Sequence, residues 1–304
     1  MSLYKMNPKV AKANFALFNL ILIIFTLLAL YFPYLINLSL DQINFKNISF
    51  NIDYLFIGIN YIQVLFAFIL PLILGKFIFK IKLKNLLKPV SISFRQLFAY
   101  FILAVLLTIL IPFIFNFIRN YINIKTEFIK PLGILSFNYF NPLYVFSILF
   151  LSPLIEELLF RGLMLRFFGK FSNYFAIMIC SFIYALMFDN ISQAFIAFVL
   201  SYLFSKITIR YRSLQPAIFL HVLYNTFFFI LQLLLYFELI SYMFVLVVII
   251  YLLAIYFYFN NNFKIVKIPY DKSFKLLVKI YFSCYSTYLL IILCLIIPFL
   301  KANL

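Results

Sequence analysis

The sequence predicts an all-α protein, a polytopic membrane helix bundle with about nine transmembrane helices. Of the 304 residues, 67% are hydrophobic and only 11% are charged, whereas a soluble domain carries about a quarter charged residues. The apolar residues form continuous runs of about twenty, the length that a helix needs to cross a bilayer. Transmembrane strands would instead show shorter segments that alternate apolar and polar residues.

Nine apolar segments justify the predicted number of helices, and we expect them to form a single membrane domain over residues 1–304. They span approximately residues 14–37, 54–75, 96–118, 142–168, 173–189, 192–209, 213–236, 240–259 and 277–299. The first segment follows three lysines, as the apolar region of a signal peptide follows basic residues. However, its apolar run is too long for a signal peptide and no small-residue cleavage site follows, so we expect it to remain as a helix.

The basic residues of the loops predict the orientation. Cytoplasmic loops of membrane proteins are enriched in Lys and Arg. With the N-terminus in the cytoplasm, twenty of the 25 Lys and Arg fall in inner segments and five in outer ones. The five outer residues are Lys46, Arg119, Lys125, Lys130 and Lys301. This bias predicts nine crossings of the cell membrane, with the N-terminus cytoplasmic and the C-terminus outside.

The formal net charge of +17 comes from these loop Lys and Arg residues, which outnumber the acidic residues. Because the positive charges lie in short clusters between apolar runs, we expect anionic lipid headgroups as partners, and no nucleic acid.

Charged residues within an apolar segment indicate a functional site, because each costs roughly 2.5–3.5 kcal/mol on membrane insertion. The fourth segment contains Glu156, Glu157 and Arg161. Glu157 and Arg161 are four residues apart and share a helix face, so they can pair. Glu156 points about 100° away, has no local partner and is a candidate general base. Alternatively, both glutamates lie solvated at the inner interface and are only structural.

Two further segments supply polar residues. The seventh contains His221, the only histidine of the chain, and Asn225 four residues later. A histidine can relay protons and an asparagine amide can donate to an oxyanion; the alternative is an ordinary interhelical hydrogen bond. The fifth segment ends at Asp189, which either joins the site or terminates a short helical hairpin. We expect these side chains to converge on a cavity that opens towards the cytoplasm.

The three cysteines, Cys180, Cys284 and Cys294, lie within apolar runs. None has the spacing of a zinc site or a redox pair. We therefore expect small buried hydrophobic side chains, no metal site and no cofactor.

Residues 142–230 resemble the CPBP family of intramembrane proteases, which includes CAAX prenyl endopeptidases of the Ras-converting type and bacterial Abi or bacteriocin-immunity proteins. The family's first motif, EExxxR, stands undamaged at Glu156–Arg161, and its last motif, HxxxN, is matched by His221 and Asn225. The resemblance implies a motif-bearing core over 142–230.

The resemblance also implies an activity, endoproteolysis of a membrane-embedded or membrane-associated peptide or protein. Glu156, assisted by His221, would activate a water molecule for attack on a peptide bond, and Asn225 would stabilise the oxyanion. Glu157 and Arg161 would maintain the helix geometry. With one histidine in the chain, only carboxylates could complete a zinc site, so zinc is not expected.

One motif departs from the family pattern. The family usually has FxxxH on the helix between the two other motifs, where this sequence has Ala185 and Asp189. An aspartate can replace only some roles of an imidazole. Two alternatives to an active protease therefore stay open. One is an inactive relative that serves as a membrane scaffold or immunity-type binding protein. The other is a small transporter or channel, which the five glycines and the absence of a visible repeat disfavour.

Overall fold

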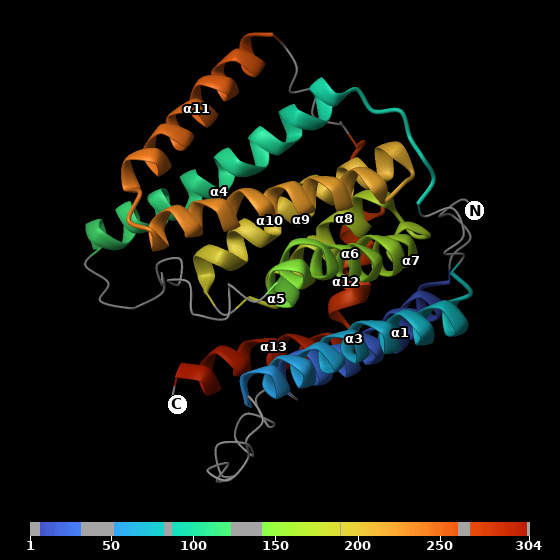
Figure 1. Cartoon of the computed structure of the whole chain (residues 1–304). Helices are drawn as coiled ribbons and strands as arrows, with labels where there is room; N and C mark the ends of the chain where they lie inside the picture. The colour runs from blue at the N-terminus through green and yellow to red at the C-terminus, as the bar shows by residue number, and fades with distance from the viewer. Residues whose placement is uncertain are drawn as a thin grey trace. The chain divides into compact units, whose positions relative to one another are not determined.

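The computed structural model describes residues 7–31, 52–81, 87–122, 142–188, 190–260 and 268–302, and within these ranges all regular secondary structure is helical (Figure 1). The elements are α1 (Pro8–Thr26), η2 (Leu27–Tyr31), α3 (Ile52–Phe79), α4 (Phe94–Ile122), α5 (Pro142–Phe146), η4 (Ser147–Leu151), α6 (Ser152–Glu157), η5 (Leu158–Met164), α7 (Leu165–Gly169), α8 (Asn173–Ala185), α9 (Ile191–Tyr211), α10 (Gln215–Tyr236), α11 (Ile240–Phe259), α12 (Phe274–Phe282) and α13 (Tyr285–Ala302), where η denotes a π-helical segment. The predicted all-α class is confirmed.

Within the described ranges, five helices are long and apolar enough to cross a membrane: Pro8–Ala29, Phe94–Phe115, Ile191–Tyr211, Gln215–Tyr236 and Ile240–Phe259. Helices α12 and α13 make a sixth if they form one span, although they are bent by 74°. These helices indicate a multi-pass membrane protein. The count of nine crossings and the cytoplasmic N-terminus stay predictions.

The chain divides into two compact units. Unit 1 comprises residues 1–83, 166–176 and 270–304, and unit 2 comprises residues 84–165 and 177–269. Each unit has buried apolar side chains of its own. That residues 1–304 act as a single membrane domain stays a prediction.

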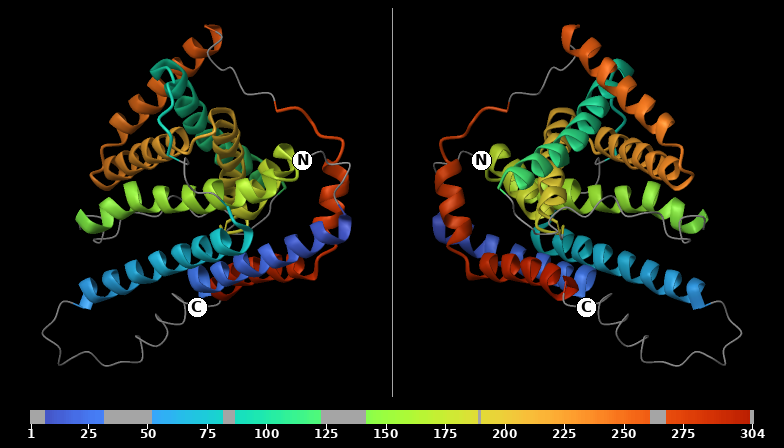
Figure 2. Two further views of the ribbon diagram at one scale, coloured as in Figure 1. Left: turned by 90° about the vertical axis from the view of Figure 1, so that its right-hand side faces the viewer. Right: turned by 90° about the vertical axis from the view of Figure 1, so that its left-hand side faces the viewer.

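Unit 1 is built around α1, which packs against α3, α12 and α13. Its centre is aromatic: the rings of Phe18 and Phe167 stack with centroids 4.1 Å apart, and both side chains are fully or almost fully buried. Asn19 joins α1 to the bend between α12 and α13, because its amide donates to Thr287 Oγ1 at 2.8 Å and accepts from the Tyr281 hydroxyl at 3.1 Å. Figure 2 shows α12 turned sharply away from α13.

Unit 2 contains α4, α9, α10 and α11, which pack against one another (Figure 1). Alanines between the helices allow close approach, as small residues do in membrane bundles, and large apolar side chains fill the remaining space. Its buried core is Ala99, Tyr100, Phe101, Ile102, Ala104, Val105, Leu200, Leu203, Phe204, Ile207, Ala217, Leu220, Ile250, Ala254 and Phe257. Other large apolar side chains of α11, such as Phe244 at 67% and Leu252 at 60%, are exposed. An apolar exterior suits a lipid surrounding.

The predicted fourth segment is helical but irregular, since π-helical turns interrupt it at η4 and η5. Pro153 provides a reason for the first interruption, because proline has no N–H to donate to the carbonyl four residues earlier. The next N–H upstream, that of Ser152, reaches back five residues to the Ser147 carbonyl. Such π turns are frequent at functional sites, and these two flank Glu156 and Glu157.

Candidate functional site

The most deeply buried charges of unit 2 meet at Glu157. Arg161 Nη1 donates to Glu157 Oε1 at 2.9 Å, and His221 Nδ1 lies 3.0 Å from the same oxygen. Both Glu157 and Arg161 are 0% exposed. The predicted pairing of Glu157 with Arg161 is confirmed. The carboxylate also connects the first and last sequence motifs directly, since His221 comes from α10.

Arg161 is enclosed by aromatic rings. Its guanidinium carbon lies 5.1 Å from the Tyr184 ring centroid and 5.6 Å from that of Phe204. Its Nε and Nη2 have no hydrogen-bond acceptor among the described residues. Because a cation is attracted to an aromatic face, the two rings stabilise the part of the guanidinium that Glu157 does not reach. Phe204 also contacts His221, with ring centroids 5.5 Å apart.

Glu156 lies in a different environment from its neighbour. Ser152 Oγ donates to Glu156 Oε1 at 2.5 Å, and the Tyr184 hydroxyl donates to Oε2 at 2.8 Å. Sequence alone left Glu156 without a local partner, and this prediction is wrong, because Ser152 lies one helical turn earlier on the same face. Glu156 is partly exposed and lines a cavity, whereas Glu157 is buried.

Asn225 follows His221 by one turn of α10 and also faces the cavity. Its amide nitrogen donates to the carbonyl of Ile148 at 2.9 Å. Ile148 belongs to the π-helical segment η4, where the altered turn changes the hydrogen bonding of backbone carbonyls. An asparagine amide has two N–H groups, so one remains for another acceptor.

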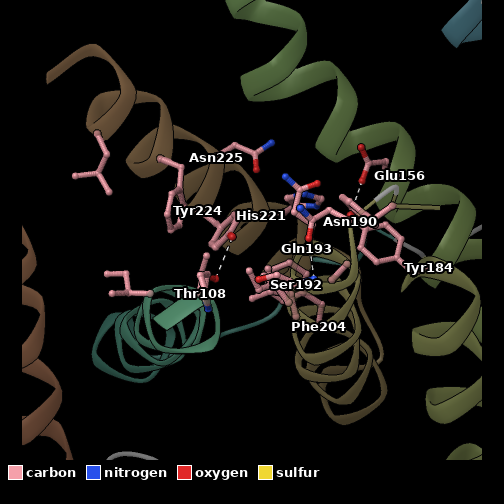
Figure 3. A pocket seen from close by; sticks show the side chains of 18 of the residues that line it. Thr108, Glu156, Tyr184, Asn190, Ser192, Gln193, Phe204, His221, Tyr224 and Asn225 are labelled. Carbon is pink, nitrogen blue, oxygen red and sulfur yellow. Dashed lines mark hydrogen bonds between the residues drawn. The ribbon is translucent and has the colours of Figure 1, made fainter. Parts of the chain in front are cut away.

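The cavity has a volume of about 730 Å³ and lies among α4, α6, α8, α9 and α10 of unit 2. At its polar end are the side chains of Glu156, Tyr184, His221 and Asn225, which Figure 3 shows around one space. Hydroxyls of Thr108 and Tyr224 hydrogen-bond to each other at 3.0 Å beside them. Its apolar lining consists of Ile109, Pro112, Phe188, Ile196, Ala197, Leu200, Phe204, Phe228, Leu231 and Leu235. The remaining lining residues, Asn190, Ser192 and Gln193, are polar.

The structure therefore brings together five of the six residues predicted as a site: Glu156, Glu157, Arg161, His221 and Asn225. The sixth, Asp189, lies outside the described residues. His221 contacts Glu157, the second glutamate.

Sequence reasoning missed Tyr184 and Ser152, both of which hydrogen-bond to Glu156. The sequence contained an indication of each contact. Ser152 precedes Glu156 by one helical turn, and Tyr184 is a polar side chain inside an apolar segment.

The three cysteines are buried and free, as expected. Within the described part of the chain, no group of three His, Cys, Asp or Glu side chains is arranged to hold a metal ion.

Taken together, the helices and this cavity define a class: a polytopic membrane protein with a carboxylate, an imidazole and an amide at one space within its helices. Comparison with protein families is more specific, because residues 138–227 match the family described as type II CAAX prenyl endopeptidase, Rce1-like. The resemblance to CAAX-type membrane proteases is thereby confirmed for this segment, which contains every residue of the two matched motifs. No curated protein and no solved structure matches the chain.

Replacing Arg161 tests the buried ion pair. We expect Arg161→Met to lower the free energy of unfolding by about 3–5 kcal/mol, because Glu157 would be left with its charge buried and without its arginine. The measurement is an unfolding titration of the purified protein in mixed micelles. Arg95→Met, which removes an exposed arginine of α4, is the matched control and should change the value by less than about 0.5 kcal/mol. If Arg161→Met and Arg95→Met had the same free energy of unfolding, the ion pair would contribute nothing to stability.

Proposed function

We propose that the protein is an intramembrane endopeptidase in which Glu156 activates a water molecule for attack on a peptide bond. The observation that carries the proposal is the position of Glu156. Its carboxylate lies in the same cavity as His221 and Asn225, while the adjacent Glu157 pairs with the buried Arg161. The match of residues 138–227 to a prenyl endopeptidase family supports the same reaction class.

Glu156 is assigned the general base. An ionised carboxylate has two oxygens with roughly four acceptor positions, and only two of them are occupied by Ser152 and Tyr184. The others can accept a proton from water as the water oxygen bonds to the peptide carbonyl carbon. The same proton then passes to the leaving nitrogen when the carbon–nitrogen bond breaks.

His221 is assigned a supporting role in the same step. With Nδ1 directed at Glu157, the tautomer that carries its proton on Nδ1 leaves Nε2 as an acceptor. Nε2 would then accept a second hydrogen bond from the attacking water and orient it towards the substrate. In the Ser-His-Asp triad, a buried carboxylate likewise fixes the ring and tautomer of the histidine.

Asn225 is assigned to the oxyanion. One of its amide N–H groups is used by the Ile148 carbonyl, which fixes the direction of the side chain. The second N–H would donate to the substrate oxygen as it becomes negative, and a preorganised donor of this kind accounts for about 2.7–4 kcal/mol in other hydrolases.

The cavity indicates the chemistry of the substrate. Its lining on α10 runs from His221 to Leu235, about 21 Å at 1.5 Å per residue. An apolar lining suits a membrane-embedded or membrane-associated peptide, with or without a prenyl group.

The proposal includes nine crossings of the cell membrane with a cytoplasmic N-terminus. In that orientation, the polar end of the cavity would lie within reach of cytoplasmic water. We expect a fluorescent-protein fusion after residue 85 or 265 to be active in the cytoplasm. A phosphatase fusion after residue 125 or at the C-terminus should be active outside. Reporter activity on the same side for residues 85 and 125, or a cytoplasmic C-terminus, would contradict nine crossings.

The glutamate mechanism predicts that Glu156→Gln abolishes cleavage but retains the bound substrate, because an amide keeps the shape of the side chain and cannot accept the proton. Membranes that contain the wild type or Glu156→Gln would be compared by proteomics of new chain ends and of co-purified proteins. Glu238→Gln, at an exposed glutamate between α10 and α11, is the matched control and should behave as wild type. Identical cleavage products with and without Glu156 would rule out the proposal. A cellular phenotype that survives Glu156→Gln, without any cleavage, would favour the scaffold alternative.

A further inference from the structure

The hydroxyl of Tyr184 is the only interhelical hydrogen-bond donor to Glu156 among the described residues, and nothing in the two matched motifs assigns it a role. We propose that Tyr184 is a positioning residue that holds the carboxylate of Glu156 in its reactive orientation. The inference rests on the proposed function and adds a third helix, α8, to the machinery that α6 and α10 provide.

Tyr184 is well placed to act as a fixed donor. Its ring is packed against Phe160, with centroids 4.8 Å apart, and against Phe188 at 5.5 Å. The guanidinium of Arg161 lies 5.1 Å from the same ring. With contacts to two rings and a cation, the phenol has little freedom to turn, so the direction of its hydroxyl is set by packing. Tyr184 lines the cavity, and its hydroxyl is directed at Glu156 (Figure 3).

The two bonds to Glu156 act together. Ser152 holds Oε1 from the same helix and Tyr184 holds Oε2 from α8, so the plane of the carboxylate is fixed by donors on opposite oxygens. A glutamate side chain is otherwise free about three torsions, and fixing it costs conformational entropy. With both bonds in place that entropy is lost on folding rather than in the transition state, which is how preorganised groups accelerate a reaction.

The identity of the donor has a chemical consequence. The family resemblance predicts a histidine on this stretch of chain, where the sequence has Asp189, whereas the side chain that reaches Glu156 from α8 is a phenol. An imidazole loses or gains a proton close to neutral pH, while a phenol keeps its O–H there. Tyr184 would therefore donate to Glu156 across the whole neutral range.

The test is a kinetic comparison of Tyr184→Phe with wild type in liposomes, with an internally quenched prenylated CAAX peptide as the probe. Phenylalanine keeps the ring against Phe160 and Arg161 and removes only the hydroxyl. We expect kcat to fall about 10- to 100-fold and KM to stay within about twofold, since the lost interaction orients the base and does not bind substrate. Tyr211→Phe is the matched control, because its hydroxyl donates to Gln96 at 3.0 Å, outside the cavity, and it should match wild type.

A stability cycle tests the contact without activity. The effects of Tyr184→Phe and Glu156→Gln on the unfolding midpoint should be less than additive, because either change removes the same bond. The effects of Tyr211→Phe and Glu156→Gln should add. Additive effects for Tyr184, an unchanged kcat, or a raised KM at constant kcat would each overturn the role of Tyr184. A wild-type protein that leaves the probe and all membrane proteins intact would instead count against the proposed function, and the stability cycle would still decide whether Tyr184 holds Glu156.

Discussion

One carboxylate oxygen organises the candidate site. Glu157 Oε1 accepts from Arg161 and faces His221 Nδ1, so it links the fourth apolar segment to α10. Burying these groups costs several kcal/mol per ion unless each is paired. The pairing therefore restricts how α6, η5 and α10 can pack. The rings of Tyr184 and Phe204 cover Arg161 from α8 and α9. The packing of these two helices is therefore restricted by the same buried ion pair.

Because Glu157 pairs with the buried Arg161, Glu156 is available for another task. Adjacent residues of a helix point about 100° apart, and here one side chain enters the core while the other enters the cavity. Neutral donors, a serine and a tyrosine, hold Glu156 in place of a cation. The proposed base is thus oriented without a permanent ion pair.

Local spacing made part of this predictable. The four-residue interval from Glu157 to Arg161 predicted their pairing, and continuous apolar runs predicted the helices. Contacts between distant segments could not be derived from spacing: His221 lies against Glu157, 64 residues away, and Tyr184 reaches Glu156 across 28 residues. The π turns were also missed, although Pro153 within a helical segment was a signal. Residues such as these depend on tertiary packing, which periodicity does not report.

Whether Glu157 orients His221 can be measured on the only histidine of the chain. Uniform ¹⁵N-histidine labelling gives one imidazole in the NMR spectrum, and its two nitrogens report the tautomer. We expect a proton on Nδ1, shared with Glu157, and a change of that signal in Glu157→Gln. An unprotonated Nδ1, or a spectrum unaffected by Glu157→Gln, would show that Glu157 does not orient His221.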